Sequence, residues 1–395
     1  MKRVLIMNGG DTELPLIFAA KKMGYYIITT GKRAEYVGHK YANEYIVADY
    51  SDCDEMLWLA TEKQIDAVCS CANDFAAISA AYVAEKLNLP GHDSFEITKL
   101  LHHKDCFKVF AKENKLLSPI SDSYNNFESV IAAQDKYEYP LIIKPVDLTS
   151  GMGVSKVENS EEYLAAAKKA LETSRIGKIV VEKFIQGSQH GFCTFLINQK
   201  VVAACSNDEY SFVNPYRVEI DMFPATGIER CKQILIDQVE KIANILKLKD
   251  GIFHLQYIED EEGPHIIEVM RRMLGNMYSV PANALMGFDW AYWQARAQMG
   301  LSCADFPFNN RAEGCFAYKT ILAQDNGRIE KINIPERYQK YIVGQNIQRH
   351  VGDVISDCVS EPVGLLFMQF SSQAEMHKVL IDEYCNNIVQ IENNE

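Results

Sequence analysis

The sequence lacks the features that would mark a membrane-spanning or secreted protein. None of its apolar runs approaches the roughly 18 residues that a membrane-spanning helix requires. The N-terminus, MKRVLIMNGG, has an apolar core of only four residues before its glycines, which is too short for a secretion signal. The 11 cysteines are an odd number at irregular spacing in a long chain, so they do not indicate a disulfide framework. We therefore expect a reduced, cytoplasmic protein.

The chain is also short of positive charge and of several familiar catalytic motifs. Lysine and arginine number 40 against 53 aspartates and glutamates, for a net charge of −13. This balance disfavours general binding to DNA or RNA, but it allows a locally basic pocket for a small anion. The sequence contains no G-x-G-x-x-G fingerprint, Walker loop, G-x-S-x-G or H-E-x-x-H motif. A dinucleotide oxidoreductase is therefore a remote interpretation, and Gly9 and Gly10 predict a tight turn after the first strand.

The closest pair of cysteines is Cys69 and Cys71, in the apolar run DAVCSC. If this run is a strand, the alternation of side chains puts both thiols on one face. Two small buried core residues are the simpler interpretation, and a metal or redox site is the alternative.

The first ninety residues alternate strand and helix patterns. Alternation of this kind predicts a parallel, doubly wound sheet. The expected strands are residues 3–8, 26–30, 44–49 and 66–71, with helices near 52–63 and 74–88.

The pattern changes at about residue 115, where strands and hairpins become more frequent. We expect helices at 158–174 and 229–248, the second with its apolar residues on one face. The last eighty-odd residues have the pattern of a small α+β unit with a helix near 373–385. A chain of 395 residues is long enough for two or three domains.

A predicted hairpin at residues 252–270 carries polar side chains inside apolar strands. Alternation puts His254 and Gln256 on one face of the first strand, and Ile266, Glu268 and Met270 on one face of the second. A loop at 260–264 would set Gln256 directly opposite Glu268. Converging oxygen ligands of this kind suit Mg²⁺. A cross-strand polar pair at a solvated face is an equally good interpretation of the hairpin alone.

A second unusual residue is Lys144, in the strand-like run LIIKPV. A lysine in an apolar strand needs a partner. The loop that follows contains Ser150, Gly151 and Gly153, whose backbone N–H groups can approach a phosphate closely while a lysine supplies charge. The simpler alternative is a lysine at a strand end followed by an ordinary turn.

Taken in order, these segments resemble the ATP-grasp enzymes, and most closely the branch of carbamoyl-phosphate synthetases and L-amino-acid ligases. Biotin carboxylase is a more distant relative of the same kind. The resemblance implies an ATP-grasp fold of mixed α/β and α+β class. It would comprise a doubly wound N-terminal domain at 1–98, an ATP-grasp domain at 99–305 with a lid at about 115–186, and a small α+β domain at 306–395.

The same resemblance implies a nucleotide site. Lys104, in HKDCFK, is similar to the first nucleotide-binding lysine, and Lys144 is similar to the lysine that contacts the phosphates. The run from Ser150 to Val154, with Gly151 and Gly153, resembles the mobile loop that closes over the phosphates. The residues similar to the adenine hinge and to the acidic group near the ribose are Glu182, Lys183, Phe184, Ile185 and Gln189.

For the metal and the reacting groups, the resemblance implies that Gln256 and Glu268 hold Mg²⁺, or Mn²⁺ in its place. The sequence departs from the commoner family pattern at two positions, with Gln256 in place of a glutamate and Met270 in place of an asparagine. A thioether is a poor ligand for Mg²⁺, so a second metal site would be weakened. Arg272 is similar to the arginine that holds the acyl phosphate or the carboxylate substrate, and Glu268 and Arg272 are the predicted catalytic residues.

These parts predict an ADP-forming carboxylate–amine ligase that works through an acyl phosphate. Its expected partners are ATP, a small carboxylate and an amine, with no nucleic acid or membrane partner, and a homodimer is compatible with the sequence. The alternatives are a bicarbonate-activating enzyme of the carbamoyl-phosphate synthetase or biotin carboxylase kind, and a nucleotide-binding module without turnover. Arg217, in the segment 206–225, is a candidate for pairing with a substrate carboxylate or a plain surface residue.

Overall fold

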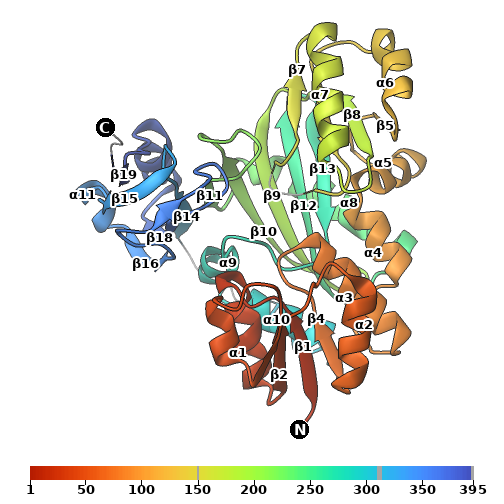
Figure 1. Ribbon diagram of the computed structural model, residues 1–395, viewed down its shortest axis with the longest axis vertical. Helices are drawn as coiled ribbons and strands as arrows, with labels where there is room; N and C mark the ends of the chain where they lie inside the picture. Colours follow the sequence, from red (N-terminus) through yellow and green to blue (C-terminus); the bar gives the residue numbers. More distant parts are fainter. Residues whose placement is uncertain (149–150, 309–313, 393–395) are drawn as a thin grey trace.

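The computed structural model describes residues 1–148, 151–308 and 314–392. The chain forms three lobes around a long central sheet, with the N-terminal lobe, a lid lobe and the C-terminal lobe at separate ends of the molecule (Figure 1). No helix in these residues is both long enough and apolar enough to cross a membrane.

The N-terminal lobe contains a four-stranded sheet in the order β3-β2-β1-β4. All three strand pairings are parallel, which confirms the predicted doubly wound sheet. The helices begin where short polar side chains accept hydrogen bonds from the first turn, as Asp52 and Asn73 do. The elements are β1 (Arg3–Met7), α1 (Leu14–Lys22), β2 (Tyr26–Thr30), β3 (Glu44–Ile46), α2 (Cys53–Glu62), β4 (Ala67–Cys69), α3 (Asp74–Lys86) and α4 (Phe95–His102).

The expectation that Cys69 and Cys71 share one strand face is wrong. Strand β4 ends at Cys69, which packs in the cluster that contains α1, whereas Cys71 packs in the cluster beneath α2 and α3. Both thiols are buried, and burial raises the pKa of Cys69 to about 12 and the pKa of Cys71 well above its usual value. Both cysteines are therefore small buried core residues on separate sides of the sheet.

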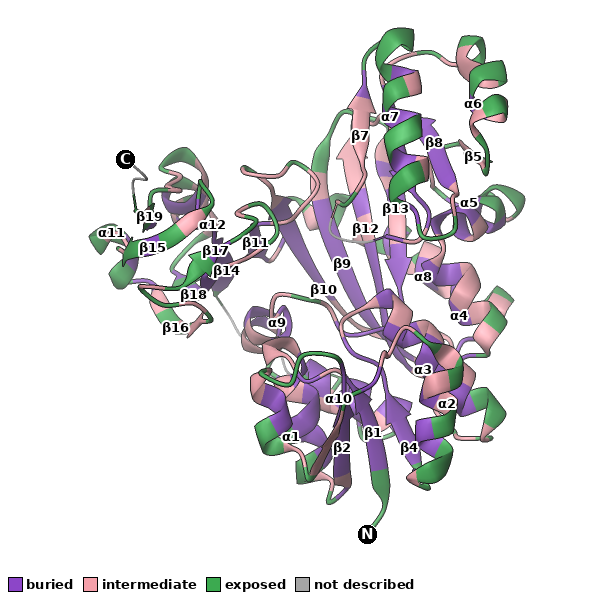
Figure 2. Ribbon diagram, in the orientation of Figure 1, coloured by how far each residue is buried: buried purple, intermediate pink, exposed green. Residues whose placement is uncertain are grey.

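The lid lobe is a small antiparallel sheet in the order β5-β8-β6-β7. Helix α7 buries Tyr163, Ala167 and Ala170 against this sheet. The outer surfaces of α6 and α7 carry exposed residues (Figure 2). The elements are β5 (Ser121–Tyr124), α6 (Phe127–Ala133), β6 (Leu141–Pro145), β7 (Ser155–Val157), α7 (Ser160–Thr173) and β8 (Ile179–Lys183), and α5 (Lys104–Glu113) leads into the lobe.

The central sheet has eight strands in the order β13-β12-β9-β10-β11-β14-β18-β16. Helix α8 (Lys232–Leu246) covers one face, where Leu235, Val239 and Ile242 are buried against β12 as the sequence pattern predicted. The elements of this part are β9 (Ser188–Ile197), β10 (Lys200–Tyr210), β11 (Ile220–Phe223), β12 (Gly251–Asp260), β13 (Gly263–Met270), α9 (Ser279–Met286) and α10 (Trp290–Gln298). Helix α10 shares one core cluster with α1, which ties the central sheet to the N-terminal lobe.

The C-terminal lobe is a mixture of strands and short helices, as expected. Three of its strands, β14 (Cys315–Ile321), β16 (Ile342–Ile347) and β18 (Gly364–Phe370), extend the central sheet. The others, β15 (Gly327–Ile332), β17 (Val354–Ile355) and β19 (Val389–Ile391), form a separate three-stranded sheet. The helices are α11 (Glu336–Gln339) and α12 (Gln373–His377), the latter followed by a π-helical turn at Lys378–Asp382. The central and C-terminal parts share one sheet, so the strands alone do not mark where one domain ends and the next begins. The domain boundaries stay predictions.

Candidate functional site

A cavity of about 440 Å³ lies between the lid strands and the central sheet. Its volume is within the usual range for a small-molecule site. It is lined by most of the residues that the sequence predicted for a site: Lys104, Lys144, Gly151, Val154, Glu182, Lys183, Phe184, Ile185, Gln189, Gln256, Glu268 and Arg272. Gly153 lies beside the cavity rather than in its wall, and Ser150 is outside the described residues. Segments that are far apart in sequence therefore meet at one place, although their individual roles stay predictions.

The two lid strands hold a buried cluster of charged side chains. Glu182 on β8 forms ion pairs with Lys144 on β6 and with Lys108 on α5, the latter at 2.8 Å. Burial alone would raise the pKa of Glu182, but the two lysines lower it to about 2. Burial lowers the pKa of Lys108 to about 8, although Glu182 partly offsets the shift. The side chain of Glu182 is thus committed to the lysines, so only backbone atoms at this residue remain for reading an adenine ring.

Lys108 did not emerge from the sequence as a site residue. It follows Lys104 by four residues on α5, and residues at this spacing lie on the same face of a helix. That spacing was the available signal. Lys104 lies at the start of the helix, where its Nζ donates to the carbonyl of Leu148 at 2.7 Å and pairs with Glu268 at 3.1 Å.

The remaining predicted hinge residues continue from β8 into the loop before β9. The backbone N–H of Phe184 donates to the carbonyl of Pro140, which leaves the neighbouring residues Lys183 and Ile185 with backbone groups beside the cavity. Lys156 lies 4.2 Å from the centre of the Phe184 ring, a cation–π contact.

The glycine loop packs against the segment between β10 and β11. Gly151 and Gly153 have φ angles of 74° and 71°, in the left-handed region that favours glycine. A Cβ atom on Gly151 would lie 2.6 Å from the Cβ of Tyr216, so a larger residue would force the loop away. The hydroxyl of Tyr216 also accepts from the N–H of Lys156 at 2.7 Å. The loop and the Tyr216 segment therefore form one wall of the cavity.

Strands β12 and β13 pair so that Gln256 lies directly opposite Glu268, as predicted. The register shifts between Gln256 and Tyr257, so Ile266 pairs with Tyr257 and Ile267 is the extra residue of a β-bulge. The expectation that Ile266 shares the face of Glu268 is wrong, because the bulge reverses the alternation. Ile266 is buried beneath α8, and Ile267, Glu268 and Met270 line the cavity.

The two arginines that follow β13 have different surroundings. Arg271 is buried against Asp93 at 2.9 Å and donates to the carbonyls of Lys249, Gly251 and Ile252. These contacts fix the start of β12, which is a structural role. Arg272 lines the cavity, and its Nε donates to Asp74 at the start of α3 at 2.5 Å.

A second group of polar residues crosses β9 and joins the predicted residues Gln189 and Gln256 to side chains of the segment 206–225. The amide groups of Gln189 and Gln256 donate to Glu209 at 2.7 and 2.9 Å, and that of Asn207 donates to Asp221 at 2.8 Å. Gly191 allows this, because a Cβ atom there would lie 2.5 Å from Oδ1 of Asn207. Such a network joins residues from four strands, so no single stretch of sequence carries its signal.

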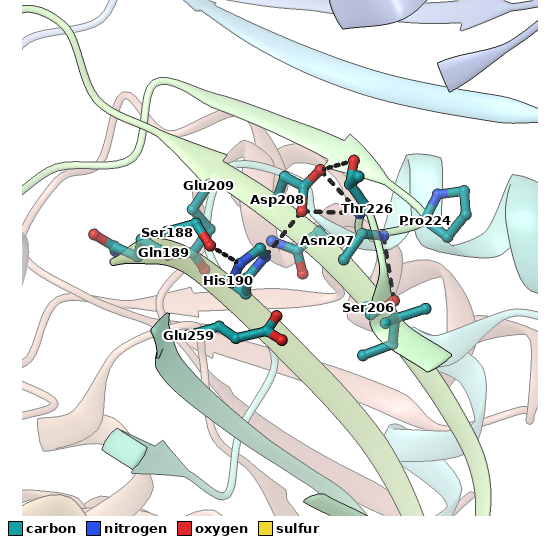
Figure 3. Close-up of polar contacts among 12 residues, drawn as sticks. Ser188, Gln189, His190, Ser206, Asn207, Asp208, Glu209, Pro224, Thr226 and Glu259 are labelled. Atoms are coloured by element: carbon teal, nitrogen blue, oxygen red, sulfur yellow. Dashed lines mark hydrogen bonds and ion pairs between the residues drawn. The ribbon is translucent and has the colours of Figure 1, made fainter. Parts of the chain in front are cut away.

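The face of β9 and β10 away from the cavity has its own polar chain (Figure 3). His190 contacts the hydroxyl of Ser188 at 2.6 Å and the carboxylate of Asp208 at 2.8 Å, and Asp208 accepts two hydrogen bonds from Thr226. Because side chains alternate along a strand, these contacts fix the pairing that presents Gln189 and Glu209 to the cavity.

Comparison with known families gives a match over part of the chain. Residues 137–280 match the family described as the ATP-grasp domain. A formate-dependent phosphoribosylglycinamide formyltransferase from Rhodococcus jostii is 27% identical over 187 residues. The alignment covers 46% of each protein, so this chain matches about half the length of the curated relative.

Two solved structures resemble the chain over nearly its whole length. An L-amino acid ligase from Bacillus licheniformis has a TM-score of 0.82 at 20% identity, with 100% of this chain and 99% of the ligase aligned. The biotin carboxylase domain of 2-oxoglutarate carboxylase from Hydrogenobacter thermophilus, in complex with MgADP and bicarbonate, has a TM-score of 0.77 at 18% identity, covering 98% of this chain and 91% of the domain. At these identities the likeness establishes a shared fold.

Proposed function

We propose that this chain, which is a member of the ATP-grasp superfamily, is an ATP-dependent, ADP-forming ligase that joins a carboxylate to an amine. The observation that carries the proposal is that positively charged side chains and oxygen ligands for a metal line the same cavity. Lys104, Lys144 and Arg272 supply positive charge, and Glu268 and Gln256 supply facing oxygen atoms. A triphosphate with its metal ion needs both kinds of group.

A free carboxylate does not react with an amine, because oxide would have to leave and is a poor leaving group. Phosphorylation of the carboxylate overcomes this. In the first step a carboxylate oxygen attacks the γ-phosphorus of ATP, and ADP leaves. In the second step the nitrogen of the amine attacks the carbonyl carbon of the acyl phosphate, inorganic phosphate leaves, and the nitrogen gives up a proton. Phosphoryl transfer depends mainly on positioning and charge neutralisation, so no nucleophilic serine or cysteine is required.

The residues present fit one divalent ion. Glu268 offers a carboxylate, and Gln256 offers its amide oxygen, because its amide nitrogen already donates to Glu209. In the described structure Nζ of Lys104 lies 3.1 Å from the carboxylate of Glu268. Mg²⁺ bound here would neutralise phosphate charge, and Mn²⁺ has the same preference for oxygen ligands. Met270 supplies no hard ligand at the adjacent position.

The chain's own residues divide the remaining work. Lys144 is held by Glu182 at the lid, where it can meet phosphate oxygens, and the Gly151 turn closes the same wall. The hydrogen bond from Arg272 to Asp74 holds the guanidinium in the cavity wall. We assign it to the carboxylate that reacts and to the acyl phosphate.

A non-catalytic nucleotide-binding module is the second candidate, and Gln256 and Met270 are the observations in its favour. A bicarbonate-activating enzyme uses the same first step with bicarbonate as the acid. The purified protein should be incubated with ATP and Mg²⁺ over panels of carboxylates, bicarbonate and amines, and ADP release should be measured. Release that requires both an organic acid and an amine supports the ligase, release with bicarbonate alone supports the second enzyme, and nucleotide binding without release supports the module. A homodimer and a cytoplasmic location complete the proposal.

A further inference from the structure

Two buried carboxylates line the cavity without a cationic side chain opposite them. Glu209 on β10 is 8% exposed, and Asp221 on β11 is 3% exposed. Throughout the described ranges, neither carboxylate comes within ion-pair distance of a lysine, arginine or histidine side chain. Removing a carboxylate from water costs several kcal/mol unless an opposite charge compensates it.

Elsewhere the fold pairs its buried acids. Among the described residues, five of them face a lysine or arginine directly: Glu182 with Lys108, Asp74 with Arg272, Asp93 with Arg271, Asp105 with Lys178, and Glu219 with Lys319. Glu13 instead accepts hydrogen bonds from the backbone N–H groups of Gly10 and Ala72. Within the described ranges, Glu209 and Asp221 thus have neither a cation nor a backbone N–H as partner, and both line the cavity.

The groups around Glu209 and Asp221 orient the carboxylates without neutralising them. Glu209 accepts from the amides of Gln189 and Gln256, and Asp221 accepts from the amide of Asn207. An uncompensated pair in a cavity is a site for a positively charged ligand.

An independent observation in the same cavity also indicates a ligand. His254 is 1% exposed and lines the cavity, and its Nδ1 has no hydrogen-bond partner among the residues that the structure describes. Its ring lies 5.9 Å from that of Tyr278, whose hydroxyl donates to Asn207 of the carboxylate network. A buried polar atom without a partner is costly unless a ligand completes it.

We propose that the cavity selects a substrate that carries a protonated amino group, which Glu209 and Asp221 hold between them, while His254 gives or accepts a hydrogen bond elsewhere on the same molecule. This inference rests on the proposed ligase function and names its substrate class. The ammonium group can belong to the acid that is activated, as in an amino acid, or to the amine that attacks. A phosphorylated substrate is disfavoured at this end of the cavity, because it would bring negative charge to two carboxylates. Arg217 also lines the cavity, and its guanidinium donates to the carbonyl of Val359.

Ligand binding can be tested without turnover by thermal shift in the presence of MgADP. The probes are amino acids matched with the same acids lacking the amino group, alkylamines, and phosphate monoesters such as ribose 5-phosphate. Stabilisation by amino acids alone places the ammonium on the acid, and stabilisation by alkylamines places it on the attacking amine. The proposal is overturned if no ammonium compound stabilises the protein, or if each amino acid and its counterpart without the amino group stabilise it equally while alkylamines do not. Stabilisation by a phosphate monoester likewise overturns it.

The variants Glu209→Gln and Asp221→Asn test the assignment to these side chains. Each should weaken binding of the ammonium ligand at least tenfold and leave the dissociation constant of MgATP unchanged, whereas Glu172→Gln on the exposed surface of α7 should change neither. Removal of an uncompensated charge should also leave the melting temperature of the ligand-free variants equal to or above that of the wild type. A lower melting temperature with unchanged ligand binding would make the carboxylates structural. An effect on the Mg²⁺ requirement alone would make Glu209 a metal ligand and would likewise refute the proposal.

These outcomes are separate from failure of the ligase proposal, which is measured by ADP release. A protein that binds an ammonium compound but never releases ADP would keep the ammonium site and lose the ligase function. A protein that needs both an acid and an amine for ADP release, but whose binding of ammonium compounds is unchanged in Glu209→Gln and Asp221→Asn, would keep the ligase function and lose the ammonium site.

Discussion

The substitution Glu182→Gln isolates the energetics of the buried cluster that holds Lys144. In the wild type, Lys108 and Lys144 hold the pKa of Glu182 at about 2, against a usual value of 4.5. One pKa unit corresponds to about 1.4 kcal/mol, so the ionised carboxylate contributes about 3 kcal/mol to stability at neutral pH. The general cost of breaking a buried ion pair, about 3–5 kcal/mol, agrees with this value.

The sign of the pH dependence is fixed by the depressed pKa. The stabilisation is fully present above the usual pKa of 4.5 and is lost as the pH falls towards 2. At pH 3.5 about 2 kcal/mol should remain by the same relation. The difference between the wild type and Glu182→Gln should therefore shrink as the pH falls below 4.5.

The assay is urea unfolding of the wild type, Glu182→Gln and the exposed control Glu172→Gln at pH 7, 4.5 and 3.5. Amide hydrogen exchange in β6 and β8 then measures the local stability of the lid. The control should match the wild type at every pH. Equal stability of wild type and Glu182→Gln at pH 7 would show that the ion pairs of Glu182 with the two lysines do not stabilise the fold. A large difference that stays constant with pH would show that the loss comes from packing rather than charge.

Three further predictions concern the nucleotide end of the cavity. Lys144→Ala should weaken MgATP binding at least tenfold, whereas Arg33→Ala on the surface of the N-terminal lobe should not; equal affinities by calorimetry would make Lys144 structural. Residues 151–154 should exchange amide hydrogens more slowly with MgATP than without it, because the loop closes over the phosphates, and identical exchange in both states would argue against closure. Arg272→Ala should lower the rate of substrate-dependent ADP release about 10²–10³-fold with a smaller effect on ATP affinity, and a variant that loses both equally would place Arg272 at the nucleotide instead.

The elements whose signal is local were predictable from the sequence. Alternation of apolar strands and capped helices gave the parallel N-terminal sheet, and spacing gave the apolar face of α8 with Leu235, Val239 and Ile242. The pairing of Gln256 with Glu268 was predictable because a short polar turn sets the register of a hairpin.

What escaped prediction depends on contacts between distant segments. The bulge at Ile267 reverses one alternation, and nothing in the apolar run HIIEVM marks it. The commitment of Glu182 to Lys108 requires α5 to lie against the lid, and the side chain of Asn207 fits over β9 only because Gly191 leaves space there. Such features are set by tertiary packing, which overrides the local pattern.

The most direct test of the central claim is a comparison of ADP release by the wild type, Glu268→Gln and Met270→Asn, with ATP, increasing Mg²⁺ and the acid and amine that the panels identify. The wild type should form ADP, phosphate and amide in equal amounts. Glu268→Gln should nearly abolish turnover, because an amide cannot supply the negative charge that the ion needs, and Met270→Asn should retain turnover and show an equal or lower Mg²⁺ requirement. If Glu268→Gln keeps the activity and metal dependence of the wild type, Glu268 is only a cross-strand polar residue, and the active site described here is in the wrong place.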